Sequence, residues 1–211
     1  MVNSNGGKVR AVISNLLRKL NGTQGKPRFA VGGSVALQLH GVRLDRPCKD
    51  LDIIPLSPIP SAAGLRRLLL EAGCQVQSSE REFPRLLRMG RVPFIFKDIE
   101  CEILNQHNRV KTCPLQGDTP SKLLNWMSEK IHTLSDSPVL DLDVVVVWMA
   151  LFGRDKDWTT IQALAGQAGR DDKPYIRDRD RIMQYVIDDR GSLSREVAFL
   201  RQVLWPRWYA Y

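Results

Sequence analysis

The spacing of hydrophobic positions changes several times along the first half of the chain. Residues 8–20 place six apolar side chains at helical spacing, which predicts an amphipathic helix. The short apolar run 29–31 ends in two glycines, as is typical of a buried strand that meets a turn. Residues 34–39 have a helical pattern again. After a basic loop, the apolar run 50–54 predicts a second strand.

The second of these strands alternates acidic and apolar residues. Its period of two places Asp50 and Asp52 on one face and Leu51 and Ile53 on the other. Two neighbouring carboxylates repel each other, and burial increases the cost of keeping both charged. A bound divalent cation removes this cost, and carboxylate oxygens suit Mg²⁺ or Mn²⁺. The pair therefore predicts a metal site, and an exposed acidic strand face is the simpler alternative.

The glycine turn between the first strand and the next helix is a second candidate binding element. Backbone N–H groups at a junction of this kind point outward without partners and can bind phosphate oxygens. Gly32 and Gly33 would allow close approach because they carry no side chain. We therefore predict that Gly32, Gly33 and Ser34 bind the phosphates of a nucleotide.

The order of glycine turn, helix, loop and Asp-x-Asp strand resembles the nucleotidyltransferase superfamily, which has the DNA polymerase β-like fold. Within it, the chain is similar to minimal bacterial members, including toxin enzymes of the AbiEii and MenA kind. The resemblance covers about residues 28–105 and is looser afterwards. It implies a mixed sheet flanked by helices, two catalytic Mg²⁺ or Mn²⁺ ions, and a nucleoside triphosphate such as ATP as the donor.

The resemblance also implies a third carboxylate on a neighbouring strand, which would help bind the metal that activates the attacking hydroxyl. In the predicted strand 98–104, Glu100 and Glu102 lie on the polar face. Glu102 fits the family pattern better because two apolar residues follow it, and Glu100 is the alternative. The family more often has aspartate here, so either glutamate is a departure.

Several basic residues are candidates for contact with the triphosphate. Arg43, Arg46 and Lys49 lie in the loop before Asp50. Residues 154–158 resemble a segment of AbiEii-like enzymes in which a cation faces the phosphates. This resemblance implies Lys156 as a further contact, with Lys130 as the alternative. The aspartate that usually follows this segment is missing from the chain.

The second half of the chain has mainly helical patterns. Residues 119–135 predict one helix, and the apolar run 144–152 predicts a buried one. A second Asp-x-Asp, Asp141 with Asp143, precedes that run without a glycine turn. We therefore interpret this pair as a helix start and not as the metal site.

The net charge of the 211-residue chain is +8, and it is unevenly distributed. Residues 1–50 contain nine Lys or Arg against two acidic residues. Positive charge beside the proposed site attracts polyphosphate, as a nucleotide or as a nucleic-acid backbone. Run 144–152 is too short to cross a bilayer, no signal peptide is apparent, and the four cysteines lack zinc-site spacing. We expect a cytoplasmic protein with reduced thiols.

We therefore expect an α/β fold with a mixed twisted sheet flanked by helices. Residues 1–117 would form the nucleotidyltransferase core with its N-terminal helix, and residues 118–211 a helical C-terminal region. The predicted reaction moves a nucleoside monophosphate to a hydroxyl acceptor, with RNA or tRNA favoured by the charge, and releases pyrophosphate. The resemblance to toxin enzymes implies an antitoxin protein as a partner.

Three alternatives to this function stay open. The first is an antibiotic-type adenylyltransferase that acts on a small molecule. The second is a non-catalytic nucleotide- or RNA-binding module with the same fold. The third is a basic α/β interaction protein that binds neither metal nor nucleotide.

Overall fold

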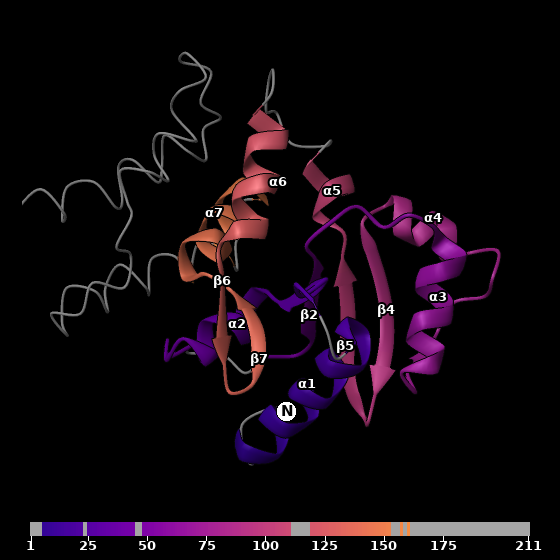
Figure 1. The fold of residues 1–211 in the computed structure, drawn as a ribbon, viewed down its shortest axis with the longest axis horizontal. Helices are drawn as coiled ribbons and strands as arrows, with labels where there is room; N and C mark the ends of the chain where they lie inside the picture. The colour runs from indigo at the N-terminus through magenta and orange to yellow at the C-terminus, as the bar shows by residue number, and fades with distance from the viewer. Residues whose placement is uncertain are drawn as a thin grey trace, which may run out of the picture.

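The computed structural model describes most of the chain up to residue 152. The described residues are 6–22, 25–44, 48–110, 119–152, 157 and 160. They form a sheet with helices packed around it (Figure 1).

Seven strands build one mixed sheet. They are β1 Phe29–Val31, β2 Leu51–Pro55, β3 Gln75–Val76, β4 Arg91–Phe96, β5 Ile99–Leu104, β6 Ile131–Leu134 and β7 Ser137–Leu140. Their order in the sheet is β3-β4-β5-β2-β1-β7-β6. The central strand β2 runs parallel to β5 and antiparallel to β1, and β7 pairs in parallel with β1. The predicted α/β fold class with a mixed sheet is therefore confirmed.

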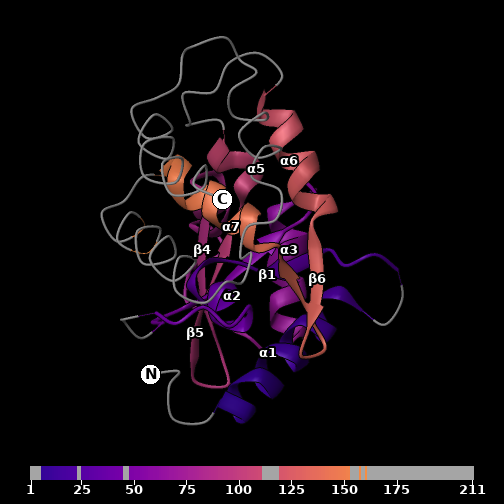
Figure 2. The same ribbon diagram turned by 90° about the vertical axis from the view of Figure 1, so that its left-hand side faces the viewer.

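The helices lie around the sheet and at its ends. They are α1 Gly6–Asn21, α2 Gly33–Leu39, α3 Ala62–Glu71, α4 Phe83–Arg88, α5 Gln106–Arg109, α6 Thr119–Glu129 and α7 Leu142–Phe152. Figures 1 and 2 show α5, α6 and α7 at the top of the molecule and α1 at the bottom. Among the described residues, no helix has both the length and the apolar composition needed to cross a bilayer.

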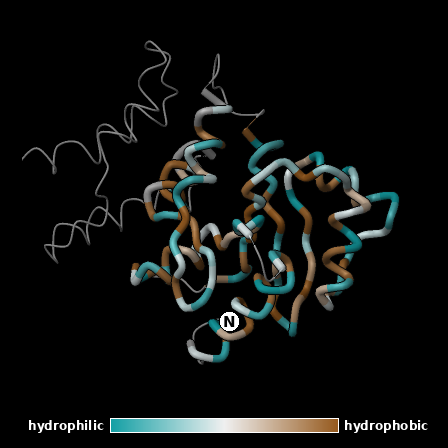
Figure 3. The backbone as a smooth tube through the Cα atoms, in the orientation of Figure 1, coloured by the Kyte–Doolittle hydropathy of each residue, from teal (hydrophilic) through white to brown (hydrophobic). Residues whose placement is uncertain are grey.

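One continuous hydrophobic core joins the strands to the helices. The inner face of α1 contributes Leu16 and Leu17, which are at most 1% exposed. In α7, residues 144–149 are all buried. Four of these are valines, which are weak helix formers, so packing and not intrinsic propensity stabilises this helix. Figure 3 shows the hydrophobic segments gathered in the strands and inner helix faces, with hydrophilic segments at the turns.

The prediction of one helix over residues 119–135 is wrong in its last part. Helix α6 ends at Glu129, and the chain continues as strand β6. Ser135 and Asp136 have φ angles of 50° and 58°, which form the tight two-residue turn of a hairpin. The hairpin adds β7 to β1, so residues 131–140 belong to the same sheet as the earlier strands. The division of the chain at residue 117 stays a prediction.

Three of the four cysteines lie in the core. Cys48, Cys74 and Cys101 are buried free thiols, and Cys113 lies outside the described residues. Burial raises the pKa of the Cys101 thiol to about 12 and that of Cys74 to about 11. These two thiols stay protonated at neutral pH. They therefore act as small apolar side chains and not as nucleophiles or thiolate ligands.

Candidate active site

Three carboxylates meet on one face of the sheet. Asp50 directly precedes β2, Asp52 lies in β2, and Glu102 lies in the neighbouring strand β5. Each offers an oxygen, and these three oxygens all lie within 4.8 Å of one another. Glu102 is only 8% exposed, whereas the two aspartates are half-buried. The cluster therefore has a fixed inner member and a solvent-accessible outer side.

The pairing of β2 with β5 decides which glutamate joins the aspartates. These parallel strands place Asp52 directly beside Glu102. Neighbouring residues in paired strands lie about 4.8 Å apart and point to the same face. Glu100 lies on that face too, but it is exposed and does not belong to the cluster. The structure thus brings Glu102 and not Glu100 to Asp50 and Asp52, while its catalytic role stays a prediction.

The glycine turn packs directly against the second aspartate. The N–H of Gly32 donates to the backbone oxygen of Asp52 at 2.9 Å, which ties the turn to β2. Gly33 has a φ of +57°, and a Cβ placed on it would lie 1.8 Å from Oδ2 of Asp52. Only glycine fits here without a shift of the carboxylate or of the turn. The space that a side chain would fill at Gly33 is occupied by the Asp52 carboxylate.

An arginine from the next strand binds the third carboxylate. Arg91 Nε donates to Glu102 Oε1 at 2.8 Å, and Arg91 Nη2 donates to Glu102 Oε2 at 2.9 Å. The Arg91 side chain is 58% exposed, and that of Glu102 is 11% exposed. Hydrogen bonding to Glu102 is the main reason that the pKa of Arg91 is raised above its ordinary value. The charges of Asp52 and Asp50 raise it further.

The donor set fits a divalent cation. Asp50, Asp52 and Glu102 supply only carboxylate oxygens, which are the ligands that Mg²⁺ and Mn²⁺ prefer. Adjacent oxygens around octahedral Mg²⁺ are about 3 Å apart. Small side-chain rotations would therefore bring the three carboxylates into range. A cation held there would also relieve the repulsion between their negative charges.

Side chains from two further elements complete the cleft. Gln106 and Arg109 of α5 line it on one side, and Trp148 and Met149 of α7 line it on another. The cavity enclosed between these groups has a volume of about 50 Å³. Ligand pockets usually measure about 300–1,000 Å³, whereas a cavity of this size holds only a few water molecules or an ion. A nucleotide would therefore need side chains at the cleft to move.

The predicted nucleotide-binding residues are only partly brought together. Gly33 and Ser34 line the cleft with the carboxylates. The described residues Arg43, Lys49 and Lys130 do not line it, and the first two are exposed. The other two, Arg46 and Lys156, lie outside the described residues. Phosphate contacts by the predicted nucleotide-binding residues therefore stay predictions.

The sequence patterns did not indicate Arg91 or Arg109. The position of Arg91 depends on the β4–β5 hairpin, which pairs Arg91 with Leu104 and Pro93 with Glu102. Arg91 is thus a diagonal neighbour of Glu102 on the same face. The turn residues Lys97 and Asp98 have φ angles of 48° and 64°, and neither is glycine. Recognition of a two-residue turn at Lys97 and Asp98 would have given the register between β4 and β5. That register would have indicated Arg91 as a neighbour of Glu102.

The second Asp-x-Asp pair, Asp141 with Asp143, belongs to a helix start, as predicted from the sequence. The backbone oxygen of Asp141 accepts the first hydrogen bond of α7 from Val145. Its side chain lies 2.6 Å from His132 Nε2. Asp141 is therefore engaged with the β6–α7 region and does not line the cleft.

Comparisons with known proteins add little to this geometry. No protein-family model matches the chain, and no curated protein matches it. Among solved structures, a crystal structure of a candidate nucleotidyltransferase from H. pylori is similar at a TM-score of 0.40 and 13% sequence identity. The similarity covers 96% of this chain and 91% of that chain. This similarity is too low to transfer a function to this chain.

Proposed function

We propose that this chain is a metal-dependent nucleotidyltransferase, which moves a nucleoside monophosphate from a nucleoside triphosphate to a hydroxyl group. The cluster of Asp50, Asp52 and Glu102 beside the Gly33 turn carries the proposal. Three carboxylates gathered in this way repel one another and do not favour folding by themselves. The same arrangement suits divalent cations that are shared with phosphate oxygens.

In the proposed reaction, the acceptor oxygen forms a bond to the α-phosphorus. The bond from the α-phosphorus to the bridging oxygen breaks, and pyrophosphate leaves. Asp50 and Asp52 would hold the cations, and Glu102 would help orient the one next to the acceptor and take up the hydroxyl proton. Bound divalent cations supply charge neutralisation at the phosphoryl oxygens. Gly33 and Ser34 line the same cleft and would contact the phosphates there.

Transfer of label tests this function directly. Each of the four nucleoside triphosphates, labelled at the α-phosphate, is incubated with the protein, Mg²⁺ or Mn²⁺, and total RNA. We expect one triphosphate to label RNA, with an equal amount of pyrophosphate released. Label on an aminoglycoside but not on RNA would support the small-molecule alternative. Neither label nor pyrophosphate with any acceptor, including protein, would contradict the proposal.

The distribution of charge supports a nucleic acid as the acceptor. Residues 1–30 contain six Lys or Arg and no acidic residue. All six basic side chains are exposed. A triphosphate requires only two or three cations, whereas a nucleic acid presents a phosphate at every nucleotide. This basic surface therefore suits a polyanion better than a small acceptor.

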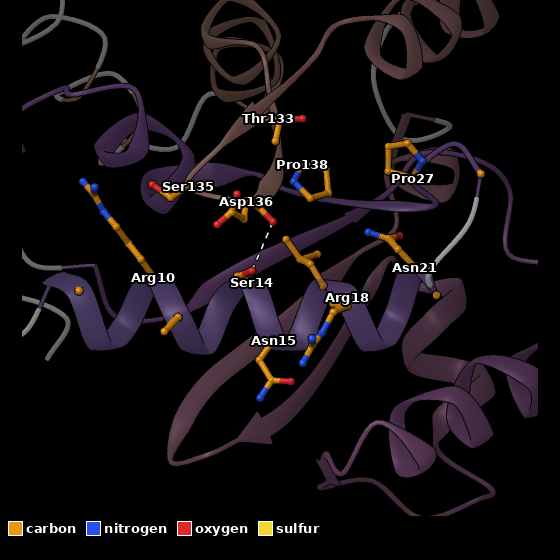
Figure 4. Close-up of a pocket in the computed structure, with 15 residues that line it drawn as sticks. Arg10, Ser14, Asn15, Arg18, Asn21, Pro27, Thr133, Ser135, Asp136 and Pro138 are labelled. Atoms are coloured by element: carbon orange, nitrogen blue, oxygen red, sulfur yellow. Dashed lines mark hydrogen bonds between the residues drawn. The ribbon is translucent and has the colours of Figure 1, made fainter.

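A large groove accompanies this basic surface. It has a volume of about 1010 Å³ and runs between α1 and the β6–β7 hairpin (Figure 4). Arg10 lies at one end and Asn21 at the other, and Ser14 Oγ donates to the Asp136 backbone oxygen at 3.3 Å between them. Arg18 also lines the groove. Arginine side chains are common donors to phosphate oxygens, so Arg10 and Arg18 are the groove residues that would contact a nucleic-acid backbone.

The groove is separate from the acidic cluster. Its lining includes Gly25 and Pro27, which precede β1, whereas Gly33 at the acidic cluster follows β1. An RNA bound along the groove would therefore contact the protein at a distance from the reacting hydroxyl. Such contacts position a backbone without reading its sequence.

Replacement of the two groove arginines tests this placement. The double variant Arg10→Gln/Arg18→Gln should weaken tRNA binding about five- to eightfold for each lost phosphate contact at 0.1 M salt. The slope of log K against log salt should also fall by about 0.7–0.9 per contact. Fluorescence anisotropy with labelled tRNA measures both quantities. Arg67→Gln/Arg81→Gln, two exposed arginines elsewhere, is the control. Equal losses in the two double variants would contradict a specific role for the groove.

A further inference from the structure

We propose that Arg91 is an internal cation that keeps Glu102 from binding metal until a triphosphate draws the arginine away. The inference rests on the proposed function and adds an order of binding to it. The free protein would bind one divalent cation through Asp50 and Asp52. The second cation would bind with the nucleotide, when Glu102 becomes available.

The geometry of the Arg91–Glu102 pair supports this role. Both oxygens of Glu102 accept hydrogen bonds from the two parallel N–H groups of Arg91, at 2.8 and 2.9 Å. This bidentate arrangement is the strongest contact that an arginine makes with a carboxylate. A metal ion at Glu102 would compete for the same oxygens and would also be repelled by the guanidinium charge. Metal ligation by Glu102 and its pairing with Arg91 therefore oppose each other.

The side chains of Arg91 and Glu102 differ in their exposure to solvent. Glu102 is fixed in a central strand, with its side chain 11% exposed and flanked by β2 and β4. Arg91 is the first residue of β4, and its side chain is 58% exposed. Arg91 can therefore swing into solvent, whereas Glu102 cannot leave the cluster. The mobile partner is the arginine.

The size of the cleft indicates what would displace the arginine. The cavity beside the cluster measures about 50 Å³, and Arg91 is among the residues that line it. A triphosphate cannot enter this volume while the side chains keep their positions. A guanidinium binds phosphate oxygens with the same two-pronged geometry that it uses for a carboxylate. An incoming triphosphate would therefore give Arg91 a new anionic partner. Movement of Arg91 to this partner would also make space for the triphosphate in the cleft.

The expected size of the effect follows from electrostatics. An opposite charge within about 4–6 Å changes the affinity of a carboxylate for a proton about ten- to a thousandfold. The same field acts on the affinity of Glu102 for a metal cation. Removal of the Arg91 charge should therefore strengthen binding of the second cation by about ten- to a thousandfold.

Counting bound Mn²⁺ by electron paramagnetic resonance tests the proposal. We expect the wild-type protein to bind one ion when free and two with the α,β-methylene analogue of the triphosphate, after subtraction of ions bound by the analogue alone. Arg91→Gln should bind two ions without the analogue. Arg67→Gln, which removes an exposed arginine outside the cleft, should behave as wild type. Glu102→Gln should bind one ion under both conditions.

Different outcomes separate this inference from the proposed function. Two ions bound equally tightly by the free wild-type protein, one ion bound by Arg91→Gln, or no second ion with the analogue would each overturn the role of Arg91. None of these results affects the proposed metal site. No ion bound by any form would overturn both. If Arg91→Gln does not fold, as judged by circular dichroism, Arg91→Lys keeps the charge without the paired hydrogen bonds. Its affinity for the second ion should then lie above that of the wild type, and an unchanged affinity would contradict the proposal.

Discussion

Asp50→Asn and Asp52→Asn are each expected to lower nucleotidyl transfer by about a thousandfold or more. Each change removes one negative charge from the oxygens that would hold the cations and keeps the size of the side chain. Metal ions contribute several kcal/mol to stabilisation of the transition state of phosphoryl transfer. Each 1.36 kcal/mol corresponds to a tenfold change in rate. The α-label transfer assay measures this loss.

The same variants should be as stable as the wild type or more stable without metal. Removal of one of three clustered charges relieves their repulsion, and we expect a gain of about 0.5–2 kcal/mol in the free energy of unfolding. Urea denaturation in the presence of a chelator measures this gain. A loss of activity together with a large loss of stability would instead indicate that the aspartates are structural.

Glu100→Gln is the matched control for the aspartate variants. Glu100 lies on the same strand face as Glu102, two residues away, but it is exposed and outside the cluster. Its replacement changes the net charge by the same amount, so general electrostatic effects are equal. Activity should therefore stay within about twofold of wild type, as for most surface substitutions. A loss as large as that of Asp52→Asn would contradict the assignment of Glu102 as the third carboxylate.

The part of the site that lies close together in sequence was predictable. Strand β1, the Gly32-Gly33 turn, α2 and β2 follow one another within 27 residues, and local patterns of period two and 3.6 define them. Alternation along β2 is enough to place Asp50 and Asp52 on one face. The prediction succeeded here because it depended only on neighbouring residues.

The parts that depend on strand pairing were not predictable in the same way. The choice of Glu102 over Glu100 is set by the register between β2 and β5. In this register Asp52 pairs with Glu102, which lies 50 residues later in the chain. The position of Arg91 beside Glu102 depends also on the register between β4 and β5. A shift of one residue moves a side chain to the other face, and sequence patterns alone did not fix either register.

The β6–β7 hairpin was missed for a related reason. Residues 131–134 have apolar side chains at both ends and polar ones between them, which continues the helical pattern of α6 equally well. Residues 131–134 form a strand because they pair with β7, which in turn pairs with β1. The turn between β6 and β7 lacks the glycine or asparagine that usually marks such a hairpin. Tertiary pairing here overrides a local pattern that allows either structure.

Gly33→Ala is the second replacement with a large expected effect. A methyl group at this position would lie 1.8 Å from Asp52 Oδ2, and 2.8 Å from its carboxyl carbon. The backbone of the turn cannot easily shift, because the Gly32 N–H donates a hydrogen bond to the backbone oxygen of Asp52 at 2.9 Å. The carboxylate must therefore turn away from its place in the cluster. A displacement of about 1 Å in a reacting group costs about a hundredfold in rate, and we expect a loss of this size.

Gly41→Ala separates this clash from the cost of the backbone conformation. Gly41 also has a positive φ, of +85°, but a Cβ there would meet no atom within 4 Å. Both variants should lose about 1–2 kcal/mol of stability from the left-handed conformation, measured by urea denaturation. Only Gly33→Ala should also lose transfer activity and Mn²⁺ affinity, because only its methyl group meets a carboxylate of the cluster. Equal activity in the two variants would show that contact between the turn and Asp52 is not needed for the reaction.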